Sequence, residues 1–162
     1  MNSSRVYTAG FTNVTLGTAA QSIIELQVPD NTVIVLLRAW LGADIGATPN
    51  DEVIDIALYG NDAAATAGSA LTEQPLTPAA AADASNVTSL GEPTIGATPL
   101  NLYNDSFHVQ NGWLYLPVPE ERPTFIGGNA DPGDNVGIRL VTASAAAWIG
   151  SGGMTWLELS AA

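Results

Sequence analysis

The chain of 162 residues has no cysteine, no lysine and a single histidine. The lack of cysteine excludes disulfides and thiolate nucleophiles, and zinc sites built from several cysteines and histidines are excluded with it. The one histidine, His108, stands between Phe107 and Val109, and we interpret it as a packing or turn residue. A Ser-His-Asp arrangement stays open, although no serine lies in a nucleophile elbow.

Positive charge is scarce as well. The chain has 16 acidic residues against four arginines, which gives a net charge of -12. This charge repels phosphate backbones and anionic lipid, so we expect neither nucleic acid nor a membrane surface as a partner. It favours a partner with basic patches. The longest strongly apolar run, residues 33–37, ends at Arg38 and is far shorter than the roughly 20 residues that a membrane helix needs.

The pattern of apolar residues predicts an all-β protein. Strands are expected over 5–9, 13–16, 22–28, 32–41, 52–59, 113–116, 136–142 and 154–159, with short strands near 71–76 and 86–90 and with glycine, proline and asparagine turns between them. No crossover helix is apparent. We therefore expect an antiparallel β-sandwich, with a jelly roll as first choice and an immunoglobulin-like sandwich as second. The whole chain, 1–162, is expected to form one domain with an Ala/Thr/Pro-rich insertion at about 63–102.

For two of these strands the sequence predicts which side chains share a face. In 22–28, Ile24, Leu26 and Val28 alternate with Ile23, Glu25 and Gln27, which predicts a half-buried strand with the first set facing the core. The strand at 32–41 is apolar on both faces, which predicts either a central strand covered by a loop or a face covered by another subunit. One face is expected to hold Val33, Val35, Leu37 and Leu41, and the other Ile34, Leu36 and Trp40.

No pattern points to catalysis or to a cofactor. Asp131, Asp134 and Asn135 are candidate calcium ligands, but their spacing is not that of an EF-hand and the same residues form a ready turn. Glu120 and Glu121 are a carboxylate pair, yet neighbours on an extended chain point to opposite sides. The remaining candidates are aromatic residues suited to a sugar platform, a core or a subunit interface: Trp40, Trp113, Tyr115, Trp148 and Trp156.

Two stretches nevertheless resemble a known class of protein. Residues 5–11 (RVYTAGF) with 13–15 (NVT), and residues 107–117 (FHVQNGWLYLP) with 119–123 (PEERP), resemble small structural proteins of tailed bacteriophages. The acidic, cysteine-free, all-β profile is similar to that of jelly-roll capsid decoration (cement) proteins.

The resemblance implies a non-enzymatic virion protein on the outer capsid surface. Such a protein would bind the major capsid protein, stabilise the head and self-associate as a homotrimer, with a dimer as second choice. The alternative is a carbohydrate- or receptor-binding module of a phage tail or fibre, which predicts exposed tryptophans on one face. The residues expected at the interface are Arg5, Tyr7, Phe11, Trp40, Trp113, Tyr115 and Arg122.

Overall fold

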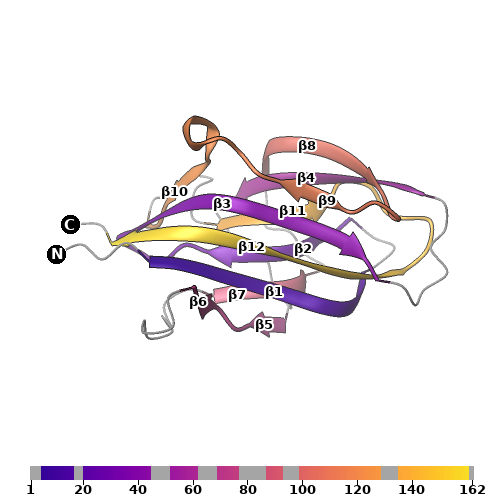
Figure 1. Cartoon of the computed structure of the whole chain (residues 1–162), viewed down its shortest axis with the longest axis horizontal. Helices are drawn as coiled ribbons and strands as arrows, with labels where there is room; N and C mark the ends of the chain where they lie inside the picture. The colour runs from indigo at the N-terminus through magenta and orange to yellow at the C-terminus, as the bar shows by residue number, and fades with distance from the viewer. Residues whose placement is uncertain are drawn as a thin grey trace.

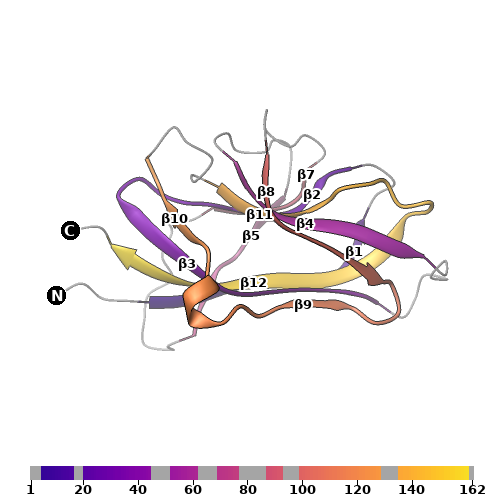
Figure 2. The same ribbon diagram turned by 90° about the horizontal axis from the view of Figure 1, so that it is seen from above.

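The protein consists of two antiparallel β-sheets that pack face to face (Figures 1 and 2). The computed structural model describes residues 5–16, 20–44, 52–61, 69–76, 87–92, 99–128 and 135–160, with the backbone alone for 87–92 and 160. Within these ranges strands predominate, and η1 (Pro119–Glu121) is a single turn of 3-10 helix. None of the described helical segments is long and apolar enough to cross a membrane. The all-β prediction is therefore confirmed.

Each sheet has six strands. Sheet A runs in the order β10 (Thr124–Ile126), β3 (Thr32–Ala43), β12 (Trp148–Ser160), β1 (Arg5–Leu16) and β6 (Gln74–Pro75), and β9 (Trp113–Tyr115) also pairs with β3. Sheet B runs in the order β5 (Ser69–Leu71), β7 (Val87–Glu92), β2 (Ser22–Gln27), β11 (Asn135–Leu140), β4 (Val53–Asn61) and β8 (Leu100–His108). In the regions where short strands are expected, the structure has β5 and β6 near 71–76 and β7 near 86–90.

The strand order is that of a jelly roll. The strands β1, β2, β3 and β4 alternate between the two sheets. In sheet B, β11 lies between β2 and β4, and in sheet A, β12 lies between β1 and β3. Two interlocked antiparallel keys of this kind define the jelly-roll sandwich. The first-choice fold is therefore correct.

One hydrophobic core lies between the sheets. Sheet A contributes large buried side chains such as Tyr7, Leu36 and Trp156, and sheet B contributes aliphatic residues such as Ile56 and Ile138, all with no exposed surface. Tyr7 and Trp156 occupy paired positions on β1 and β12 and their rings stack at 6.1 Å. Burial of so many large apolar groups supplies the main stabilising term.

Two strands are longer than the sequence predicts. Residues 5–16 form one strand, β1, instead of the two strands expected. The register with β12 shifts between Phe11, which pairs with Gly152, and Val14, which pairs with Gly150, and Asn13 in this irregularity has a positive φ of 58°. β12 begins at Trp148 rather than at residue 154, since its glycines pair with β1 and β3 instead of forming a loop. Both errors come from reading glycine and asparagine as strand ends.

The predicted faces need two corrections. β2 is buried on both faces, because Ile23 and Glu25 are as inaccessible as Ile24 and Leu26. β3 changes phase at a bulge: Arg38 pairs with Thr155 and Leu36 with Trp156, so Leu37 has no opposite residue. Leu41 therefore faces the core together with Ile34 and Leu36, and Trp40 lies on the outer face.

Candidate functional site

The outer face of sheet A is an extended surface of aliphatic side chains. Cross-strand partners share a face, so Val6, Leu157 and Val35 form one row, and Leu159, Val33 and Ile126 form the next. These side chains are half-buried, except Ile126, which is 48% exposed. No other described strand lies beyond sheet A on this side (Figure 2). β3 is therefore central, yet its second face is left open.

The described strands of sheet A place no acidic side chain on this outer face, and Asp44, directly after β3, lies at its far end, where its carboxylate accepts hydrogen bonds from Ser151 Oγ. Among the strands of sheet A the only acid is Glu158, and its side chain faces the core and is buried. The strands of sheet B carry four acids: Glu25, Asp55, Glu92 and Asp105. A chain of net charge -12 thus presents one broad face on which its charge is largely absent.

Trp40 occupies the far end of this face in an unusually close fit. Its ring lies over Gly153, where an added Cβ would come within 2.5 Å of the ring, and beside Gly10. The guanidinium carbon of Arg38 lies 4.9 Å from the ring centroid, and Arg38 Nε donates a hydrogen bond of 3.0 Å to Thr155 Oγ1. Two glycines and a cation therefore hold the indole flat against the sheet.

The residues expected at an interface fall into two groups. Tyr7, Phe11 and Trp113 are 0%, 6% and 7% exposed because they face the core, so their assignment to an interface is wrong. Arg5, Trp40, Tyr115 and Arg122 are half-buried and remain accessible in part. Their positions differ: Trp40 lies on the outer face of sheet A, Arg5 begins β1, and the other two flank the loop that holds η1.

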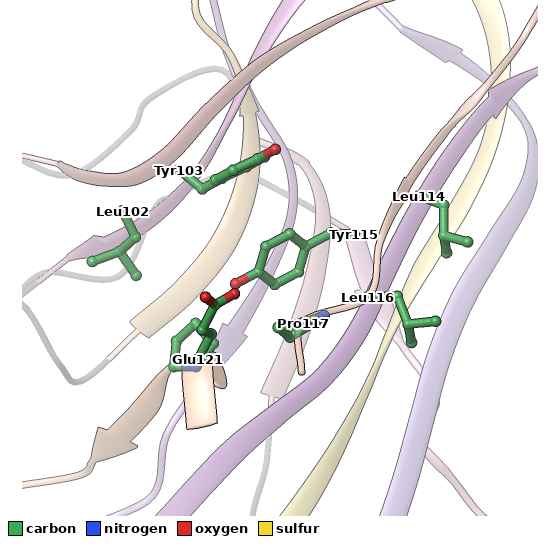
Figure 3. Close-up of a pocket in the computed structure, with 8 residues that line it drawn as sticks. Leu102, Tyr103, Leu114, Tyr115, Leu116, Pro117 and Glu121 are labelled. Atoms are coloured by element: carbon green, nitrogen blue, oxygen red, sulfur yellow. The ribbon is translucent and has the colours of Figure 1, made fainter. Parts of the chain in front are cut away.

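A groove of about 530 Å³ opens between β8 and β9, beside η1 (Figure 3). Tyr115 lies at its centre, and Tyr103 of β8 approaches it with ring centroids 5.3 Å apart and planes tilted by 49°. At one end Trp113 Nε1 donates a 3.0 Å hydrogen bond to Asp105 Oδ2, which ties β9 to β8. The lining consists of Leu102, Tyr103, Leu114, Tyr115, Leu116, Pro117, Glu121 and Pro123.

The groove has a negative electrostatic character. Burial, then the charge of Glu121, then Tyr103 raise the pKa of Tyr115 above its usual value of 10.0. Figure 3 shows the Glu121 carboxylate directed toward the phenol of Tyr115. Glu121 is the only charged residue of the lining, so a ligand with positive charge is the natural complement.

The predicted chemical sites gain little support. The Nδ1 atom of His108 accepts a 3.3 Å hydrogen bond from the backbone N–H of Gln110, so His108 shapes the turn after β8. The calcium candidates Asp131 and Asp134 lie outside the described residues, and Asn135 begins β11, where its side-chain amide donates to the carbonyl of Asn61. No cluster of three or more metal-ligating side chains occurs within the described part of the chain.

Sequence reasoning missed the side of the groove that β8 forms. It selected Tyr115 and Glu121 but not Leu102 and Tyr103, which reach the groove from the other sheet. The available signal was the run LNLY at 100–103, which contains two leucines and a tyrosine. Only the pairing of β8 with β4 places that run beside β9.

Comparison of the chain with protein-family models, curated proteins and solved structures finds no match.

Proposed function

We propose that the protein is a structural virion protein, a decoration (cement) protein that self-associates and binds the outer surface of a phage head. The observation that carries this proposal is the aliphatic outer face of sheet A, on which the described strands place no acidic side chain. Two further points support the proposal. The fold is a jelly roll, and residues 5–15 and 107–123 resemble small structural proteins of tailed bacteriophages. The partner of this face in self-association is a second copy of the chain.

The size of the face suits a stable interface. The three long strands β1, β3 and β12 have 12, 12 and 13 residues; strands rise about 3.3 Å per residue and lie about 4.8 Å apart, so these three offer a face of about 600 Å². The short strands β9 and β10 extend this face toward the area of about 800 Å² that each partner buries in a typical specific interface. Charge favours the same surface, because two chains of charge -12 repel each other least where acidic side chains are fewest.

The geometry of the face and the resemblance predict different symmetries for the oligomer. A flat face that packs against its own copy makes an isologous contact, which gives a dimer. The resemblance implies a trimer around a symmetry axis. Light scattering at about 10 to 100 μM, a range in which ordinary homo-oligomers form, separates the two. Added salt is expected to strengthen association because it screens the repulsion between acidic chains.

Leu157→Lys tests whether this face forms the contact. The substitution places a charge in the middle of the outer face and is expected to weaken association at least tenfold, or about 1.4 kcal/mol. It also lowers the net negative charge, so greater repulsion between chains cannot explain the loss. Val53→Lys is the matched control, because Val53 is 60% exposed on β4 in the other sheet. A monomer at every concentration, or equal effects of both substitutions, contradicts self-association through this face.

Binding to the capsid requires a separate experiment. Co-sedimentation of the purified chain with heads of the phage or prophage that encodes it is expected to show saturable binding at a fixed number of sites. A failure to bind heads contradicts the decoration role even where the chain forms an oligomer.

The alternative, a carbohydrate- or receptor-binding module, predicts exposed tryptophans on one face. Trp113, Trp148 and Trp156 are buried, and Arg38 covers the ring of Trp40. A tryptophan platform is therefore not formed by any of the four tryptophans. The feature that still favours this alternative is the groove at Tyr103 and Tyr115, where a bound sugar is expected to alter the tyrosine resonances.

A further inference from the structure

The groove at Tyr103 and Tyr115 adjoins an open sheet edge. β8 is the last strand of sheet B, and no described strand pairs with its outer edge. An edge strand of this kind offers unpaired N–H and C=O groups, to which an extended segment of another protein can add as a further strand. β8 has nine residues; the N–H of Ser106 already donates to the Asp105 carboxylate, so an added strand would pair with the half of β8 that carries Leu102 and Tyr103.

The side chains around this edge are suited to a peptide. Leu102, Leu114 and Leu116 are 42%, 62% and 67% exposed, and together with two prolines they provide apolar contact along the groove. Exposed apolar residues that gather at one groove, rather than scattered singly, mark an interaction surface.

The centre of the groove is suited to a cation. Two tyrosine rings lie 5.3 Å apart, and the Glu121 carboxylate lies beside them without any basic residue in the lining. Aromatic faces and a carboxylate attract a cationic side chain. Burial first, and then the charge of Glu121, raise the pKa of Tyr115.

We propose that the groove binds an extended segment of a partner protein that carries an arginine. The segment lies along the outer edge of β8, and its arginine packs against the rings of Tyr103 and Tyr115 with the guanidinium group at Glu121. Arginine fits better than lysine because its planar group stacks on aromatic rings and binds a carboxylate through two N–H groups. A sugar fits less well, since the lining offers one carboxylate and two phenols amid leucine and proline.

This inference does not rest on the proposed decoration role. The groove is centred between β8 and β9, whereas the proposed self-association surface is centred on Leu157 and Val35 of sheet A. Leu157→Lys is therefore expected to leave peptide binding intact. Conversely, substitution of Glu121 is expected to leave the solution mass unchanged, so the two proposals fail or succeed separately.

The test uses the full chain and fluorescein-labelled heptapeptide mixtures. The central residue is arginine, lysine or citrulline, and the other six positions are randomised. Citrulline has the shape of arginine without its charge, so fluorescence anisotropy is expected to show roughly tenfold tighter binding of the arginine mixture. Hydrogen exchange is expected to show protection of the amides of residues 102–104 when the arginine mixture is bound.

Two neighbouring glutamates provide a matched pair of variants. Glu121→Gln is expected to remove the preference for arginine over citrulline. Glu120→Gln removes the same charge one residue away, outside the lining, and is expected to keep the preference. Tyr103→Phe is expected to retain binding, because the ring face survives, whereas Tyr103→Ser is expected to weaken it. Both glutamates are exposed, so the fold tolerates either change, as near-UV circular dichroism can verify.

Several results would overturn the proposal. One is no binding of the arginine mixture at about 1 mM, the upper limit for a specific site. Equal binding of the arginine and citrulline mixtures is another, and equal losses in the two glutamine variants would show that only the diffuse charge matters. Saturable binding of a glycan that Glu121→Gln abolishes, without any preference among peptides, would assign the groove to a sugar.

Discussion

The hydroxyl of Tyr59 on β4 donates a hydrogen bond to the buried carboxylate of Glu25 on β2, across the intervening strand β11. The bond is possible because Gly137 stands between them in the register and leaves room for the tyrosine ring. Ser22 Oγ lies 2.8 Å from the same hydroxyl. A fully buried carboxylate requires such partners, because its desolvation is costly. This cluster fixes the mutual position of three strands of sheet B.

Gly137→Ala is expected to destabilise the fold. An added Cβ would lie 2.7 Å from the Tyr59 ring and 2.6 Å from the carbonyl oxygen of Ile24. Overpacking of this kind costs about 1–3 kcal/mol, which urea denaturation measures as a lower midpoint. Gly42→Ala is the control, because nothing lies within 4 Å of its added Cβ. Equal midpoints for the two variants would show that the contact at Gly137 relaxes freely.

Tyr59→Phe isolates the hydroxyl from the ring. The phenylalanine keeps the packing over Gly137, while the Glu25 carboxylate loses a buried donor. We expect a loss of about 1–3 kcal/mol in the free energy of unfolding. Tyr103→Phe removes a hydroxyl from a side chain that is 44% exposed and is expected to change stability little. Comparable effects of the two substitutions in urea denaturation would contradict a stabilising role for the Tyr59 hydroxyl.

Arg38→Met is expected to uncover Trp40. The change removes the cation over the indole and the hydrogen bond to Thr155, while the methionine keeps an apolar stem. Trp40 is the only tryptophan that is not buried, so it dominates acrylamide quenching of the native protein. Quenching is expected to increase in Arg38→Met and to stay unchanged in Arg139→Met, whose arginine bonds to Asn101 on the other sheet.

Periodicity was sufficient to predict the strands that line the core. Ile54, Ile56 and Leu58, like Val136, Ile138 and Leu140, alternate as a half-buried strand should, and all six are buried. The jelly-roll choice followed from many short strands without a crossover helix. The strand order itself depends on contacts between distant residues, such as β1 with β12, that no local pattern contains.

The errors have local physical causes. A single extra residue at Leu37 reverses which side chains of β3 face the core, and a bulge leaves no mark in the apolar pattern. Tyr7 and Phe11 resembled interface residues because aromatic side chains suit a core and an interface equally well. The groove could not be predicted as a whole, since Tyr103 and Tyr115 come from different sheets and meet only in the folded sandwich.

Tyr115 provides a pH-dependent signal for the groove. Burial and the negative charge of Glu121 both disfavour the phenolate, so the pKa of Tyr115 lies above its usual value of 10.0. A group whose pKa is raised on folding contributes stability that is fully present below the unfolded pKa. That contribution is lost as the pH rises through the folded pKa. We therefore expect stability to fall in alkaline solution above about pH 10, and less so in Tyr115→Phe.

Carbon-13 NMR of labelled tyrosine follows this titration directly and separates Tyr115 from the other three tyrosines by comparison with Tyr115→Phe. Glu121→Gln is expected to lower the pKa of Tyr115 toward its usual value, because it removes the nearby charge but leaves the burial in place. Glu120→Gln removes an equal charge from the same turn and is expected to have a smaller effect, since only Glu121 lines the groove. An identical shift in both variants would mean that Tyr115 responds to the overall charge of the loop and not to a carboxylate positioned against its phenol.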